Sequence, residues 1–157
     1  MSTAIDRAWA FLMQAEGGGA LVTDAGGLTK YGISQRAYPD EDIRNMTEWR
    51  AQVLFRRDYW EACQCDQLPP ALAVAVVDAA FNQGVSAAIT LLQHALKVPV
   101  DGVMGPVTIA AAQRQGRKAV NEFLARRLMR YAAGESAYQR GWFLRVLNLK
   151  DAVQEFR

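Results

Sequence analysis

The stretch ALAVAVVDAAFN, residues 71–82, contains the most apolar run of the chain. Its apolar residues fall on nearly every side of a helix, which is typical of a helix buried in the centre of a domain. Pro69 and Pro70 separate it from the residues upstream. The run is far shorter than the ~20 residues that a membrane-spanning helix needs, and it contains Asp78. We therefore predict a buried central helix and no stable insertion into a membrane.

Amphipathic segments flank this helix on both sides. In residues 3–15, Ile5, Ala8 and Leu12 share one face, Ser2 or Thr3 can cap the start, and the glycines at 17–19 end the segment. Further helices are expected at 47–60, 86–97, 107–115, 117–133, 135–147 and 149–156. The sequence thus predicts an all-α protein, mainly helical with a small Gly-rich β or loop excursion near residues 17–34.

The composition is that of one folded domain. Of the 157 residues, 51% are apolar and 22% are charged, which is too apolar for a disordered chain. The charge is uneven: residues 1–113 hold 8 basic and 12 acidic side chains, whereas residues 114–157 hold 10 and 4. A basic second part fits an anionic partner such as nucleic acid, wall polymer or a membrane surface, and it equally fits a solvated helix face.

The Gly-rich segment at 16–32 carries the groups best suited to chemistry. Glu16 falls at the expected C-terminal end of the first helix, where the helix dipole, together with any burial, disfavours the ionised carboxylate. A carboxyl group that keeps its proton suits general acid catalysis. Asp24 can face Glu16 across the flexible turn, and Thr29 can hold a water molecule. Two carboxyl groups in different surroundings are what cleavage of a glycosidic bond requires. An exposed helix-end glutamate and an Asx-turn aspartate are the structural alternatives.

Other chemistries have little support in the sequence. The single histidine, His94, leaves no pair for a His-Glu-x-x-His metal site and little scope for a Ser-His-Asp triad. The segment GGLTK lacks the full phosphate-binding loop pattern. We therefore expect neither a metal ion nor an organic cofactor.

Several motifs occur in a fixed order along the chain. They are EGG…DAGGLTKYGIS (16–34), RRDYW (56–60), CDQLP (65–69), VVDAAFNQG (76–84) and RGWFLRV (140–146). This series resembles glycoside hydrolase family 108, bacterial and phage peptidoglycan hydrolases. Residues 91–112 are similar to the peptidoglycan-binding segment that accompanies the family. The chain departs from the family pattern at Gly19, where a tyrosine is usual, and in a shorter interval between Glu16 and Asp24.

The resemblance implies a lysozyme-like N-acetylmuramidase that cleaves the β-1,4 glycan strand of the bacterial cell wall. Glu16 matches the family's general acid, and Asp24 and Thr29 would orient the attacking water, which gives inversion. If the two carboxyl groups were only about 5–5.5 Å apart, Asp24 would instead be the nucleophile of a retaining enzyme. Tyr31 is expected to stack on a sugar ring or to serve as a core aromatic, and Asp78 to bind substrate or to fix the Gly-rich loop. The complete set of expected substrate-binding residues is Tyr31, Asp78, Asn82 and Gln83.

The expected organisation is a single compact, monomeric domain over residues 1–157. Residues 1–85 would form the catalytic part and residues 86–157 a helical, peptidoglycan-binding-like part. The main alternative is a non-catalytic wall-binding or secretion-assisting protein on the same scaffold. A nucleic-acid binder is disfavoured because no helix-turn-helix pattern is recognisable. The N-terminal residues lack signal-peptide features, so we expect synthesis in the cytoplasm and release to the cell wall or periplasm by a holin-like or other signal-independent route, as for a phage or gene-transfer particle.

Overall fold

The computed structural model describes residues 2–24, 27–134 and 136–156, without the side chains of Asp24 and Ser136. Its α-helices are α1 (Ala4–Glu16), α2 (Glu48–Phe55), α3 (Pro70–Gln83), α4 (Val85–Leu96), α5 (Pro106–Gln115), α6 (Arg117–Ala132) and α7 (Ser136–Val153). A π-helix, η1 (Arg56–Glu61), and a 3-10 helix, η2 (Cys65–Gln67), connect α2 to α3. The strands β1 (Val22–Asp24), β2 (Gly27–Lys30) and β3 (Ile33–Ser34) form one antiparallel sheet in that order. The prediction of a mainly helical fold with a small β excursion is confirmed.

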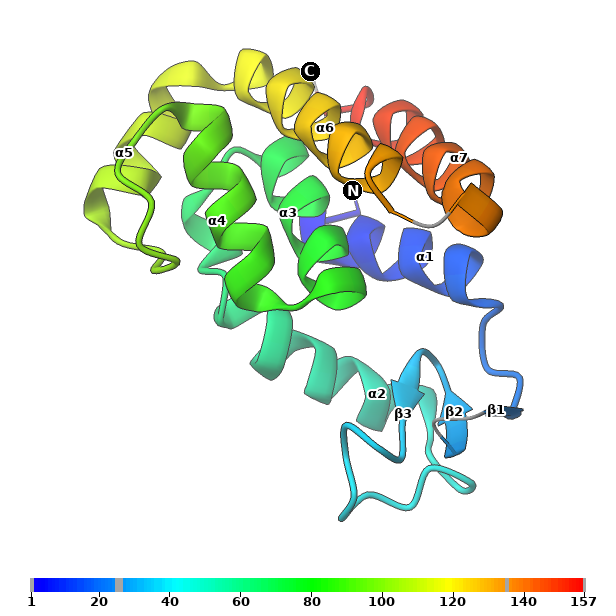
Figure 1. Ribbon diagram of the computed structural model, residues 1–157. Helices are drawn as coiled ribbons and strands as arrows, with labels where there is room; N and C mark the ends of the chain where they lie inside the picture. The colour runs from blue at the N-terminus through cyan, green and yellow to red at the C-terminus, as the bar shows by residue number, and fades with distance from the viewer. Residues whose placement is uncertain (1, 25–26, 135, 157) are drawn as a thin grey trace.

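Helix α3 lies at the centre of the molecule, as its all-round apolar pattern predicts. It is packed against α1, α4, α6 and α7 (Figure 1). Nine consecutive residues, Leu72 to Ala80, are buried, and Asp78 is among them. No helix in the described ranges is both long and apolar enough to span a bilayer.

Local signals in the sequence fix the two ends of α1. Thr3 and Asp6 form a capping box at the start. At the other end Gly17 adopts the left-handed conformation with φ +79°, and the Gly18 N–H donates to the Met13 carbonyl at 2.7 Å. The helix therefore stops with Glu16 as its last residue, as the glycine cluster predicts.

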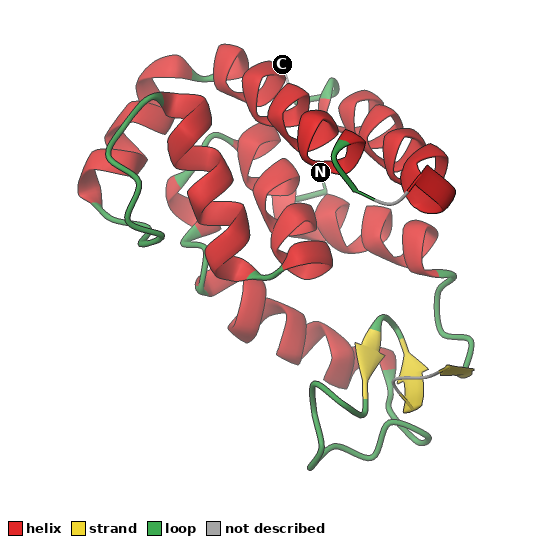
Figure 2. Cartoon of the chain, in the orientation of Figure 1, coloured by secondary structure: helices red, strands yellow, loops and turns green. Residues whose placement is uncertain are grey.

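The Gly-rich segment forms a twice-folded ribbon at the edge of the helical body (Figure 2). Strands β2 and β3 pair Lys30 with Ile33, so Tyr31 and Gly32 make a two-residue turn. Both residues have positive φ, +53° and +72°, as a type I′ hairpin turn requires. Ile33 is fully buried and attaches the ribbon to the core.

Two helix predictions need correction. Separate helices were expected at 135–147 and 149–156, but residues 136–153 form one helix, α7, with Gly141 and Asn148 in its interior. The buried Val146, Leu149 and Val153 continue one face across the expected break, and their packing outweighs the low helix propensity of the two interior residues. The expected helix at 47–60 begins after Thr47 but passes into the π-helix η1 after Phe55, which the sequence pattern did not indicate.

Candidate active site

Glu16 projects from the end of α1 toward α7. Its Oε1 atom accepts a hydrogen bond from Nη1 of Arg145 at 2.7 Å, in an ion pair. The Glu16 side chain keeps 28% of its surface exposed, whereas Arg145 keeps 12%. Glu16 is therefore a carboxyl group that solvent and ligands can reach, and its position is fixed by an ion pair with a mostly buried cation.

Asp78 links Arg145 to a second arginine inside the protein. Its Oδ1 accepts from Nη2 of Arg145 at 2.8 Å, and its Oδ2 accepts from Nη1 of Arg127 at 2.5 Å. Asp78 is 1% exposed and the Arg127 side chain 0% exposed. Arg127, Asp78, Arg145 and Glu16 thus form a charge chain that alternates in sign and joins α6, α3, α7 and α1.

The charge chain changes the acidity of Arg145. Burial by itself lowers the pKa of the Arg145 guanidinium, because it disfavours the charged form. The negative charge of Asp78 and the hydrogen bonds to Asp78 and Glu16 act in the opposite direction, and the net pKa is raised. Arg145 is therefore a permanent cation beside Glu16, and its charge opposes the effect of the helix dipole and of burial that the sequence predicted for this carboxyl group.

Asn82 is connected to the same buried arginine by a different route. The Tyr131 hydroxyl donates to Asn82 Oδ1 at 2.6 Å, and its oxygen accepts from Nε of Arg127 at 3.1 Å. Of the predicted binding residues, Asp78 and Asn82 are therefore brought together through Arg127. Gln83 is not joined to them: its Oε1 is buried and has no hydrogen-bond partner among the described residues.

A pocket of about 420 Å³ lies beside the charge chain, between α1, α3 and α7. Arg145 and Asn82 line it, together with the carboxamides of Gln14 and Asn148 and the ring of Trp142. Its volume is in the range of sites that hold small ligands (about 300–1,000 Å³). Aromatic and carboxamide side chains together offer an apolar face and hydrogen bonds to a neutral ligand.

The turn between β2 and β3 lies against the acid. A Cβ atom placed on Gly32 would come within 3.3 Å of Glu16 Cγ and 2.7 Å of the Phe81 ring. A Cβ on Gly19 would come within 2.7 Å of the Tyr31 ring. The two glycines thus let the turn approach Glu16 and let Tyr31 fold back over the end of α1. The family tyrosine expected at position 19 would collide with Tyr31 in this arrangement.

Tyr31 holds a conformation that favours glycine. Its φ of +53° costs a non-glycine residue roughly 1–2 kcal/mol. The type I′ turn requires this conformation, and the predicted role of Tyr31 in stacking on a sugar ring stays a prediction.

The remaining predicted catalytic residues lie on the first two strands. Thr29 is half-buried in β2 and pairs with Val22 and Ser34. Asp24 pairs with Gly27 through the backbone, but its side chain, which carries the predicted role, lies outside the described part of the structure. Whether Asp24 and Glu16 face each other stays a prediction.

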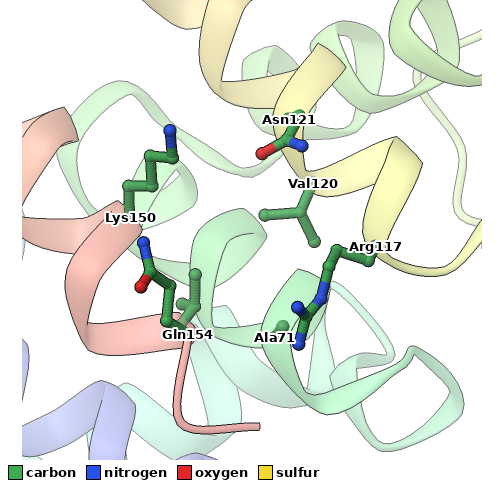
Figure 3. A pocket seen from close by; sticks show the side chains of 7 residues that line it. Ala71, Arg117, Val120, Asn121, Lys150 and Gln154 are labelled. Atoms are coloured by element: carbon green, nitrogen blue, oxygen red, sulfur yellow. The ribbon is translucent and has the colours of Figure 1, made fainter. Parts of the chain in front are cut away.

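A second pocket, of about 260 Å³, lies near the far end of α7. Figure 3 shows Arg117 and Asn121 of α6 across from Lys150 of α7 and Gln154, which directly follows α7. None of its lining residues is a carboxylic acid, so the pocket lacks the pair of carboxyl groups that hydrolysis of a glycosidic bond requires. Over the described residues, no three His, Cys, Asp or Glu side chains are grouped to hold a metal ion.

The comparisons with known proteins agree with the motif series. Residues 9–84 match the family model described as glycosyl hydrolase 108. These residues form a glycosyl hydrolase 108 domain. The predicted resemblance is confirmed, and the match includes all seven predicted site residues, from Glu16 to Gln83.

A solved structure is similar over nearly the whole chain. SagA of Brucella abortus has 27% sequence identity and a TM-score of 0.85, over 97% of this chain and 94% of that one. No curated protein matches the chain in sequence. The fold of the glycosyl hydrolase 108 domain and of the helices that follow it is therefore shared with SagA.

Three residues of the hydrogen-bonded network that joins Glu16, Asp78 and Asn82 were not predicted from the sequence: Arg127, Tyr131 and Arg145. All lie beyond the segment that matches the glycosyl hydrolase 108 family. Arg145 stands inside the RGWFLRV motif, and Arg127 falls on the apolar face of α6, four residues after Phe123 and four before Tyr131. A cation on a buried face needs a buried anion, so Arg127 and the central Asp78 were a detectable pair.

Proposed function

We propose that this protein is a peptidoglycan hydrolase of the N-acetylmuramidase type, which cleaves β-1,4 glycosidic bonds in the bacterial cell wall. The observation that carries the proposal is the placement of Glu16 within a glycosyl hydrolase 108 domain. Glu16 is an accessible carboxyl group between a hairpin turn, at Gly32, and a fixed cation, Arg145. A glycan strand that lies along the hairpin would pass over this carboxyl group.

In this mechanism Glu16 is the general acid. In its protonated form it donates a proton to the glycosidic oxygen as the bond from that oxygen to the anomeric carbon breaks. The carboxylate that remains is then paired with Arg145, in the arrangement that the structure displays. Arg145 therefore stabilises the product of the proton transfer.

Asp24 and Thr29 complete the reaction. The Thr29 hydroxyl, both donor and acceptor, holds a water molecule, and Asp24 accepts a proton from that water as its oxygen bonds to the anomeric carbon. Attack from the face opposite the leaving oxygen inverts the configuration. These roles rest on the family resemblance and on the position of both residues in the ribbon next to Glu16.

The substrate is held by the groups around the acid. Tyr31 stacks on a sugar ring, and Asn82 and Gln83 offer amide hydrogen bonds to N-acetyl groups. Asp78 is buried and both its oxygens are bonded to arginines, so we assign it a role through Arg145. The helical part at 86–157 contributes Arg145 and Trp142 to the site and, in this proposal, further contact with the wall.

Analysis of the reaction products tests the function. Purified peptidoglycan is digested, reduced with borohydride and hydrolysed, and the reduced sugars are identified by mass spectrometry. The proposal predicts muramitol from new reducing ends. Glucosaminitol instead would show a glucosaminidase. Binding to the wall without new ends of either kind would show a non-catalytic wall-binding protein.

A further inference from the structure

We infer that Arg127 is a positioning residue that fixes two parts of the site at once, through two hydrogen-bonded branches. The acid branch runs through Asp78 and Arg145 to Glu16, and the amide branch runs through Tyr131 to Asn82. The inference rests on the proposed function, because it takes Glu16 as the acid and Asn82 as a substrate contact. Arg127 itself touches neither the substrate nor the reacting atoms.

The acid branch is a series of direct contacts. Nη1 of Arg127 donates to Asp78 Oδ2 at 2.5 Å, which leaves Oδ1 for Nη2 of Arg145 at 2.8 Å. Nε of Arg145 also donates to the Asp78 carboxylate, at 3.2 and 3.3 Å, so the edge of the guanidinium that carries Nε and Nη2 is fixed. Only Nη1 of Arg145 then points to Glu16, at 2.7 Å. The orientation of the Glu16 carboxyl group thus depends on Asp78, and that of Asp78 on Arg127.

The amide branch sets which atoms Asn82 presents. Because the Tyr131 oxygen accepts from Arg127 Nε, its proton is directed to Asn82 Oδ1, at 2.6 Å. The carboxamide is thereby oriented with Oδ1 inward. Its Nδ2 has no partner in the described part of the chain and remains a donor at the wall of the 420 Å³ pocket. A ligand with a carbonyl oxygen, such as an acetamido group, fits this donor.

The placement of Tyr131 supports the same conclusion. Its ring is stacked on Trp142, with the centroids 5.0 Å apart, and the Arg127 guanidinium lies 5.5 Å from its centroid. Trp142 also lines the pocket. Arg127 therefore fixes one polar and, through the ring, one apolar element of the same pocket wall.

Stability alone gives a weak reason for an arginine at position 127. Its side chain is fully buried, and Nη2 has no hydrogen-bond partner among the residues described. Apolar side chains of similar volume often serve at least as well as a buried ion pair. An arginine at position 127 can serve both branches, because its guanidinium donates from Nε to Tyr131 and from Nη1 to Asp78 in fixed directions.

The test separates the branches with three variants. Tyr131→Phe removes the amide branch alone, Arg127→Met removes both, and Arg127→Lys keeps a charge for Asp78 but lacks the second donor for Tyr131. Arg126→Met is the matched control, because Arg126 is the neighbouring arginine of the same helix, is partly exposed and forms an ion pair with Glu122. The measurements are kcat and KM on soluble, peptide-free glycan strands, Kd for the same strands by calorimetry, and the side-chain amide NMR signal of Asn82.

We expect Tyr131→Phe to raise KM and Kd about 3- to 10-fold, as for one lost hydrogen bond, with kcat nearly unchanged and the Asn82 signal shifted. Arg127→Met should give the same Kd change and also lower kcat by roughly 10- to 100-fold, because Glu16 loses its fixed position. Arg127→Lys should recover kcat but not Kd. A smaller folded fraction would not produce this pattern, in which kcat recovers in Arg127→Lys while Kd stays raised.

Contrary results are equally defined. Wild-type Kd and Asn82 signal in folded Tyr131→Phe, or equal kcat and Kd losses in Arg127→Lys and Arg127→Met, would overturn the inference. If the wild-type protein binds the strands but releases no reducing ends, the proposed hydrolase fails. The Kd and NMR measurements then still decide the amide branch, and the chemical shift of the Glu16 carboxyl carbon in Arg127→Met decides the acid branch.

Discussion

Gly32 is the residue at which the hairpin meets the proposed acid. Its φ of +72° suits glycine, and an added Cβ would lie 2.7 Å from the Phe81 ring and 3.3 Å from Glu16 Cγ. Phe81 cannot easily move away, because its ring packs against two other aromatic rings. The distance between ring centroids is 4.9 Å to Tyr59 and 6.1 Å to Phe55. The space next to Glu16 therefore depends on the absence of a side chain at this position.

We predict that Gly32→Ala destabilises the protein by roughly 1–3 kcal/mol and reduces hydrolysis more than its folded fraction explains. Denaturant unfolding and turnover of glycan strands measure the two effects. Gly27→Ala is the matched comparison, because its φ is +95° but, among the described residues, its Cβ would meet only Gln35 Cβ, at 3.7 Å. Equal losses in both variants would show that backbone strain alone matters and that the contact with Glu16 does not.

At the scale of the elements, Gln93 gives a structural reason for the polar residues in the motif of residues 91–112. Its side chain donates to Asp101 Oδ1, to the Val103 carbonyl and to Thr108 Oγ1, and accepts from the Asp101 and Gly102 N–H groups. These polar groups hold the connector between α4 and α5 together. Its exposed side chains include the apolar Val100 and Val103, and a third exposed valine, Val107, follows in the first turn of α5. Contact of this segment with the wall stays a prediction.

The same connector should make stability depend on pH. The Val103 N–H and the Gln93 amide hydrogen-bond to the Asp101 carboxylate and hold its pKa below the ordinary value. A group with a lowered folded-state pKa stabilises the protein above its unfolded-state pKa, about 4, and this contribution is lost as the pH falls through the folded-state value.

We therefore predict that Asp101→Asn is less stable than the wild type at pH 7 and that the difference narrows below about pH 4. Urea unfolding between pH 3 and pH 7 measures it. Asp40→Asn, at an exposed position with no ion pair in the described ranges, is the control. A difference that stays constant or widens toward pH 3 would contradict the assignment.

Helices illustrate what the sequence can and cannot specify about the fold. The capping box of α1, the glycines after it and the prolines before α3 and α5 are local signals, and the corresponding boundaries were predicted within a residue or two. The continuity of α7 through Gly141 and Asn148 depends on the core that its buried face meets. No pattern within 135–156 contains that information.

Over the whole molecule, the site joins segments that lie far apart in sequence. Glu16 and Arg145 are separated by 129 positions, and Asp78 and Arg127 by 49. The motifs predicted Glu16 and Asp78 as separate candidates, but their connection follows from the packing of α1, α6 and α7 around α3 (Figure 1). A single sequence identifies the residue types of such a site more readily than the pairs they form.

The uneven charge of the chain also has an internal explanation. Arg127 and Arg145, from the basic part of the sequence, neutralise Asp78 and Glu16 from the acidic part. Part of the excess positive charge in residues 114–157 is thus neutralised by ion pairs within the protein. The charge distribution by itself gives little reason to expect nucleic acid as a partner.

Hydrolysis by wild type and Glu16→Gln, compared side by side, tests the central claim most directly. New reducing ends are counted on purified peptidoglycan, with Glu61→Gln, at an exposed position, as the matched control. We predict turnover by the wild type and the control, and a loss of roughly 100-fold or more in Glu16→Gln with wall binding retained. Glu16→Gln turning over at the wild-type rate would contradict the account, because the proton would then come from another group.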